Sequence, residues 1–117
     1  MIRVRVSGMA RLSASLRRLR ETQTVAMAAA VARGARDVRD AARRELPRRS
    51  GRLARAVTIE TAADGLAATV GTDLDYGTYL ELGTRRMAAQ PWLLPAFRGV
   101  RARLHANFAR AVRTGKP

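Results

Sequence analysis

The sequence contains no cysteine, one histidine and only five aromatic residues in 117. The absence of cysteine excludes disulfide frameworks, thiolate catalysis and cysteine-ligated zinc. Alanine, in contrast, fills 23 positions. With so few large side chains, the core of the protein must be thin and closely packed.

Long hydrophobic runs are also absent. The longest, residues 25–32, is mostly alanine and falls well short of the ~18–20 residues needed to span a bilayer. The first six residues alternate charged and apolar side chains, unlike a signal peptide, which needs a continuous apolar stretch. We therefore expect no membrane partner.

Acidic residues are scarce: 9 Asp and Glu stand against 23 Lys and Arg, for a net charge of +14. The charge is unevenly distributed. Residues 1–55 hold 15 bases and 4 acids, residues 56–84 hold 5 acids and no base, and residues 85–117 hold 8 bases and no acid. An acidic island, residues 56–84, thus lies between two basic arms. A strong charge excess implies a polyanion, an acidic protein or a second copy as partner, and the segregation favours head-to-tail contact between copies.

Hydrophobic periodicity predicts a strand over residues 1–8 and helices over residues 9–46. In the first helix, apolar residues recur from Met9 to Leu19 at helical spacing. Residues 22–24 are expected to interrupt the helical region. The second stripe begins at Val25, continues through small residues to Leu46, and is stopped by Pro47.

The second half of the chain predicts a hairpin and two more helices. After a loop at residues 48–52, apolar and polar residues alternate on both sides of Asp64 and Gly65, which predicts a hairpin over residues 53–72. A short helix is expected over residues 76–83, closed by Gly83 in the left-handed conformation, and a C-terminal helix over residues 92–113. The expected fold is a single α+β domain of residues 1–117, with a small antiparallel sheet and central hairpin packed against long amphipathic helices.

Catalytic and metal-binding signals are weak. His105, the only histidine, falls between the core positions of the last helix, as expected of a surface residue. Asp73 and Asp75 could hold a hard cation, but acidic residues in a solvated turn explain them more simply. We assign no active site, metal or cofactor.

The basic charge favours contact with nucleic acid, since arginine binds phosphate well. The arginines are, however, spread over three predicted helices and several loops, and no DNA-recognition motif is present. Non-specific DNA binding remains an alternative function. A membrane-active basic helix over residues 92–113 is a further alternative.

An ordered set of short motifs extends from residue 50 to residue 97. Its characteristic residues are Ser50, Gly51, Leu53, Gly71, Tyr76, Tyr79, Glu81, Gly83, Thr84, Gln90, Pro91 and Trp92. In this order and spacing, the segment resembles the tail-component, head–tail joining family of long-tailed phages of the Hong Kong 97 type. One departure is Gly77, which stands where alanine is usual in that family.

This resemblance implies a structural virion protein of the head–tail interface, a neck or tail-completion protein with no enzymatic activity. The implied subunit assembles as a ring, commonly of six copies, between the head-connector ring and the tail terminator or tail tube, and DNA passes through the lumen. Its expected location is the phage virion, with assembly in the host cytoplasm.

A ring of identical subunits joins two different surfaces of each copy. The acidic island and the basic arms could form such a pair, so charged residues within and just after the island are candidates for contacts between subunits. They are Glu60, Asp64, Asp73, Asp75, Glu81, Arg85 and Arg86. For Glu81, an exposed position or an ion pair with Arg85 in the same chain is an equally open alternative.

Overall fold

The computed structural model describes residues 2–7 and 21–115. The helix predicted from Met9 to Leu19 lies outside these ranges. The described elements, in chain order, are β1 (Ile2–Val6), α2 (Glu21–Glu45), α3 (Gly51–Ala56), β2 (Thr58–Thr61), β3 (Ala68–Thr72), α4 (Asp75–Leu82) and α5 (Leu93–Thr114). The predicted α+β class is confirmed.

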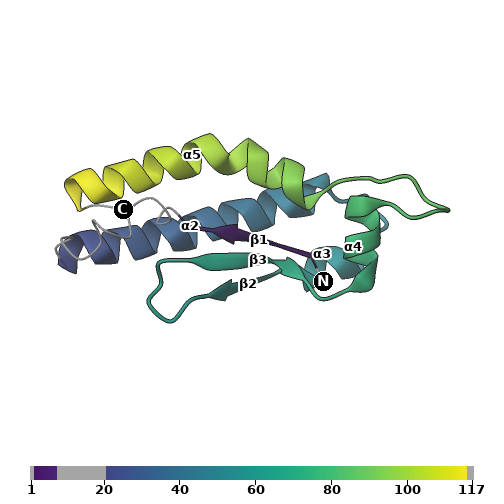
Figure 1. Ribbon diagram of the computed structural model, residues 1–117, viewed down its shortest axis with the longest axis horizontal. Coiled ribbons are helices and arrows are strands. Elements are labelled where there is room, and N and C mark those ends of the chain that lie inside the picture. The colour runs from purple at the N-terminus through teal and green to yellow at the C-terminus, as the bar shows by residue number, and fades with distance from the viewer. Residues whose placement is uncertain (1, 8–20, 116–117) are drawn as a thin grey trace.

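The elements form an elongated body with extents of 52 × 21 × 19 Å (Figure 1). The three strands form an antiparallel sheet in the order β1-β3-β2, which packs against α2. The long helices α2 and α5 lie side by side and run in opposite directions, while α3, α4 and the loop between α4 and α5 lie together at one end (Figure 1).

The core is built from small residues on α2 and larger ones on α5. Ala35, Val38 and Ala42 of α2 are fully buried, and Leu104 and Phe108 of α5 are also buried. At Gly34, any Cβ atom would overlap the side chain of Leu104. The alanine-rich composition thus has a direct structural role, because it allows α2 to approach its neighbours closely.

Two details of the α2 prediction were wrong. Residues 22–24 do not interrupt the helix: α2 begins at Glu21, and Gln23 donates a hydrogen bond from Nε2 to the carbonyl of Val112 in α5, at 2.7 Å. Packing against α5 outweighs the few tenths of a kcal/mol that threonine costs in a helix. Val25 is 65 % exposed, and the buried stripe instead passes through Met27 and Val31.

The turn of the predicted hairpin is confirmed, but the predicted start of the hairpin is wrong. Gly65 has φ +75°, and the Asp64 carboxylate accepts a hydrogen bond from the Leu66 N–H at 2.9 Å. Residues 51–56, predicted as loop and strand, form α3 instead. In this helix Leu53 is buried, and its anchoring in the core favours one helical turn and a half over extension of the strand.

Candidate functional site

The motif residues gather at the end of the molecule where α3 and α4 meet the start of α5. Trp92 anchors this junction: it is fully buried and donates a hydrogen bond from Nε1 to the Gly77 carbonyl at 3.0 Å. A Cβ at Gly77 would lie 2.6 Å from Thr72 Cγ2, 3.1 Å from Leu53 Cδ1 and 3.3 Å from the Trp92 ring. The departure from alanine at this position therefore matches a close approach of α4 to its neighbours.

Glu81 joins α4 to α5 through three hydrogen bonds. Its Oε2 accepts from the Trp92 N–H at 2.9 Å, and its Oε1 accepts from the Leu93 and Leu94 N–H groups at 3.0 and 2.9 Å. The first N–H groups of a helix lack partners within the helix and carry partial positive charge. The buried carboxylate of Glu81 thus caps α5 from another helix.

This role corrects the predictions for Glu81. The residue is only 8 % exposed, so it is not a surface residue, and its two oxygens are occupied by backbone donors rather than by Arg85. Glu81 is therefore removed from the candidates for contacts between subunits. One signal could have indicated the cap: the α5 N-cap residue, Trp92, has no side-chain oxygen with which to cap its own helix.

The loop between α4 and α5 projects from the end of the molecule (Figure 1). Gly83 opens it with φ +77° and ψ 171°, a positive φ as predicted but outside the predicted left-handed helical region. Thr84 forms an isolated bridge with Met87, and the Gln90 N–H donates to the Leu80 carbonyl at 2.7 Å. The Gly83 N–H also donates to the Tyr79 carbonyl at 2.7 Å, so the loop is tied back to α4 at both of its ends.

Several residues of this loop are exposed: Arg85, Arg86, Gln90 and Pro91. Arg85 and Arg86 stay candidates for contacts with another molecule.

The outer face of α4, defined here as Tyr76, Tyr79 and Leu82, is exposed. These side chains are 40, 50 and 71 % exposed, whereas Leu80 on the opposite side is fully buried. Both tyrosines of the chain lie on this face.

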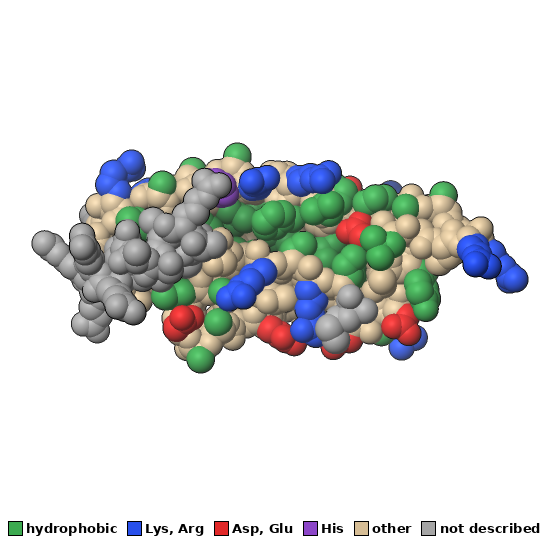
Figure 2. Space-filling model, viewed as in Figure 1, with side chains coloured by type: hydrophobic (Ala, Val, Ile, Leu, Met, Phe, Trp, Pro, Cys, Tyr) green, Lys and Arg blue, Asp and Glu red, His purple; other side chains and the backbone are tan. Residues whose placement is uncertain are grey.

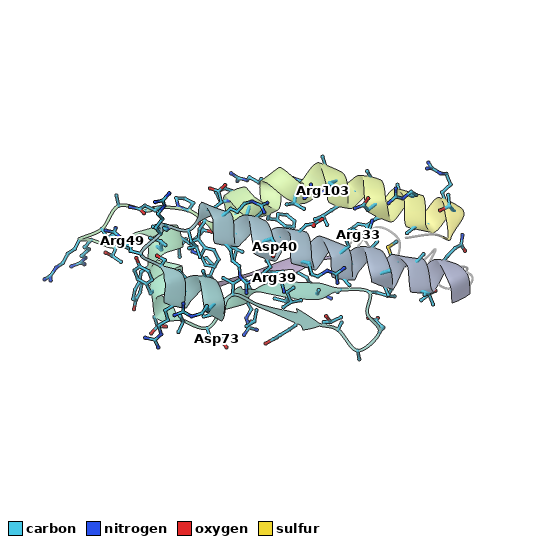
Figure 3. The ribbon with its side chains drawn as sticks, turned by 180° about the vertical axis from the view of Figure 1, so that it is seen from behind. Arg33, Arg39, Asp40, Arg49, Asp73 and Arg103 are labelled. Carbon is cyan, nitrogen blue, oxygen red and sulfur yellow. The ribbon has the colours of Figure 1, made fainter. Side chains whose placement is uncertain are left out.

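Beside the outer face of α4 is an open hollow of about 350 Å³. Its walls come from the starts of α3 and α4, and the residues that line it are Arg49, Ser50, Arg52, Leu53, Leu74, Asp75 and Tyr76. Ser50 is 4 % exposed, and its hydroxyl has no hydrogen-bond partner within the described part of the chain. Figure 3 shows Arg49 at this end of the molecule.

Two of the acidic candidates contact an arginine of the same chain. Arg3 lies across β3 and reaches Asp73 Oδ1 with Nη2 at 2.8 Å and Glu60 Oε2 with Nη1 at 3.7 Å. Gly71 permits this path, because a Cβ there would lie 2.6 Å from Arg3 Cγ. The hydrogen bond to Asp73 raises the pKa of Arg3 above its ordinary value, and the nearby charge of Glu60 adds to the effect.

The other two acidic candidates lie at opposite ends of the acidic island in space. Asp64 is exposed in the hairpin turn, and Asp75 is exposed in the first turn of α4. A carboxylate at the start of a helix is stabilised by the helix dipole. Neither forms an ion pair in the described residues.

The helices carry most of the described arginines. Arg33, Arg39 and Asp40 project from α2 and Arg103 from α5 (Figure 3). Arg103 pairs with Asp37 at 3.4 Å, joining the two helices. Over Leu93–Thr114, α5 has five arginines and no acid, and Figure 2 shows basic side chains along the α5 side and acidic ones mainly along the sheet side.

Nothing in the described part of the chain forms a catalytic or metal centre that we can assign. Within residues 2–7 and 21–115, no three His, Cys, Asp or Glu residues are grouped so that they could hold a metal ion. His105 is exposed. Among the described helices, none has the length and apolar character needed to cross a bilayer.

Comparison with known proteins gave one family match. Residues 10–83 match the model of the HK97-gp10-like family, whose description reads "Bacteriophage HK97-gp10, putative tail-component". The matched range contains α2, the hairpin and α4, including Ser50, Gly71 and Glu81. The searches of curated proteins and of solved structures returned no match.

Proposed function

Because the chain belongs to the HK97-gp10-like family of phage tail components, we propose that it is a neck or tail-completion subunit that assembles into a ring at the head–tail interface. In this proposal DNA passes through the lumen, and the neighbours are the head-connector ring on one side and the tail terminator or tail tube on the other. The observation that carries it is the outer face of α4.

This face has the properties of a protein interface. Tyrosine is enriched in protein–protein contacts because one ring buries a large area while its hydroxyl can still hydrogen-bond. The helix beneath is held by the Trp92–Gly77 and Glu81–α5 hydrogen bonds. A rigid support reduces the entropy lost when such a face binds a partner.

The charge distribution supports assembly from unlike surfaces. A cyclic ring needs two different and complementary patches on each copy, and the chain offers an acidic hairpin side and strongly basic helices. Six copies at +14 would repel one another strongly unless acidic partners or DNA offset the charge. Contacts with acidic surfaces are therefore part of the proposal.

Size-exclusion chromatography with light scattering, followed by negative-stain imaging, tests the proposal. We expect closed rings of the wild-type chain at high concentration, and loss of those rings when Tyr79 and Leu82 are both changed to Ser. Changing the exposed Ala102 and Ala109 of α5 to Ser is the matched control and should leave the rings intact. A chain that remains monomeric at every concentration reached, alone and with DNA, would contradict the proposal.

The alternative of a basic non-specific DNA-binding protein is favoured by one observation, the five arginines and absence of acid on α5. It predicts tight binding of duplex DNA by a monomer, with affinity that falls steeply as salt rises. Light scattering of the DNA complex across a salt series distinguishes the two functions: rings persist without DNA in the first and never form in the second.

A further inference from the structure

The hollow beside α4 lies next to the outer face of α4. An inference drawn from it extends the proposed function. The hollow has room for about a dozen water molecules at ~30 Å³ each, which is enough for a few small side chains. Leu53, Leu74 and Tyr76 supply apolar wall. Arg49 and Arg52 supply two positive charges, and Asp75 supplies one negative charge. The lining is thus net positive, and an occupant that combines small apolar groups with an acid matches it.

The Ser50 hydroxyl supports an occupant of this kind. It is buried at the wall of the hollow and has no partner in the described part of the chain. Buried hydroxyl groups are nearly always hydrogen-bonded, since leaving one unpaired costs about 1–3 kcal/mol. A carbonyl or carboxylate entering the hollow would supply the missing partner.

The hairpin turn of the same protein has the matching chemistry. Its exposed tip is formed by Ala62, Ala63 and Asp64, two small apolar side chains and one carboxylate. Residues 58–72 contain two acids and no base, whereas residues 48–55, next to the hollow, contain four arginines and no acid. The two surfaces thus carry net charge of opposite sign.

The tip and the hollow of one molecule are too far apart to meet. The turn lies toward the end of the long axis away from α4 (Figure 1), and the molecule extends 52 Å along that axis. Contact between them must therefore join two copies. Such a contact is heterologous, so it repeats from copy to copy and closes into a ring when the rotation permits.

We propose that the hairpin turn of one copy, residues 62–66, inserts into the hollow between α3 and α4 of the next copy. Asp64 then lies near Arg49 and Arg52, and the hydroxyl of Ser50 donates to an oxygen of the incoming turn. The outer face of α4, which borders the hollow at Tyr76, packs against the incoming hairpin. This inference rests on the proposed self-assembly of the chain and identifies the two surfaces that meet when copies assemble.

Because the chain has no cysteine of its own, a disulfide cross-linking test involves only the cysteines that are introduced. In a double variant, Ala63→Cys is placed on the turn and Asp75→Cys on the rim of the hollow. Disulfides form only when the two Cα atoms approach within about 4.4–6.8 Å. We expect mild oxidation to produce a ladder of covalent oligomers on a non-reducing gel.

Two controls test whether the ladder reports the proposed contact. The pair Ala63→Cys and Ala109→Cys, with the second cysteine on the exposed surface of α5, should produce no ladder beyond adventitious dimers. A mixture of the two single variants Ala63→Cys and Asp75→Cys should stop at dimers, because each copy then has one reactive position. Equal ladders from the test pair and the α5 pair would overturn the proposal.

A charge variant tests the same contact without cross-linking. Asp64→Asn removes the charge but keeps the oxygen that accepts from the Leu66 N–H, so the turn itself is preserved. We expect Asp64→Asn to weaken self-association about 10-fold. The control Glu45→Gln, at an exposed acid of α2, should leave self-association unchanged.

If wild-type rings form while Asp64→Asn assembles normally and the test pair gives no ladder, this contact is wrong but the ring function stands. A wild-type chain that never assembles overturns both.

Discussion

The α2–α5 pair and the α4 junction are stabilised by different kinds of interaction. The two long helices meet through small side chains of α2 and larger apolar side chains of α5, and Gly34 lies directly against Leu104. At the junction, the short α4 packs closely at Gly77 and Leu80, and hydrogen bonds also cross between elements, from Trp92 to Gly77 and from the start of α5 to Glu81. Apolar packing dominates the first region, whereas bonds between buried polar groups are added to it in the second.

The difference has a functional consequence. A helix that is held by a few strong polar bonds on one side needs little apolar burial, so its other side is available for contacts outside the chain. On α4 that side carries Tyr76, Tyr79 and Leu82. The long helices have no such freedom on their facing sides, because almost every apolar residue there is used in the core.

The largest effect on stability is expected at Glu81. In Glu81→Ala three N–H groups at the start of α5 lose a charged acceptor, and we expect the free energy of unfolding to fall by about 3 kcal/mol. Glu81→Gln keeps the acceptor oxygens in part and loses the charge, so a fall of about 1 kcal/mol is expected. Urea denaturation followed by circular dichroism measures both. If the Ala variant is as stable as wild type, Glu81 does not hold the junction.

A smaller effect is expected in the α2–α5 pair. Gly34→Ala gains up to about 1 kcal/mol of helix propensity, but the added methyl overlaps Leu104, and overpacking costs about 1–3 kcal/mol. We expect a net loss of about 1 kcal/mol in the same denaturation experiment.

Gly99 of α5 is the matched control for Gly34. It is also inside a long helix, but a Cβ there would meet nothing within 4 Å. Gly99→Ala is therefore expected to raise the free energy of unfolding by about 0.5–1 kcal/mol. If both glycine variants change stability in the same direction, the close contact between α2 and α5 is not what determines the response at Gly34.

The α2–α5 pair was largely predictable from the sequence because its signal is periodic. Positions such as Ala35, Val38 and Leu104 recur at helical spacing, and Pro47 marks the end of α2. The errors fall at the start of α2, where runs of alanine around Met27 leave the buried stripe ambiguous by one or two positions. Periodicity identifies a helix more securely than it identifies which of several small residues is inside.

The α4 junction was predictable in outline and not in its contacts. The short helix, the turn at Gly83 and the anchor at Trp92 follow from local residue chemistry. The partners of Glu81 do not, because they lie 11–13 residues away and are backbone groups of another helix. Likewise, no local pattern indicates that α4 turns Leu80 inward and leaves Tyr76 and Tyr79 outside.

The smallest effect on stability, and the sharpest test of the comparison, is expected on the outer face of α4. Tyr79→Ser and Leu82→Ser remove apolar groups that are already half or more exposed, so the free energy of unfolding in dilute monomer should change by no more than about 0.5 kcal/mol. Self-association, measured by light scattering of the same samples at high concentration, should nevertheless weaken about 10-fold or more, because interface aromatics contribute on the order of 2 kcal/mol to binding. The reverse pattern is expected at Gly34. Gly34→Ala should lower the free energy of unfolding and leave association of the folded chain unchanged. A Tyr79→Ser variant that loses stability and assembly in proportion would mean that this face supports the fold itself rather than contacts between molecules.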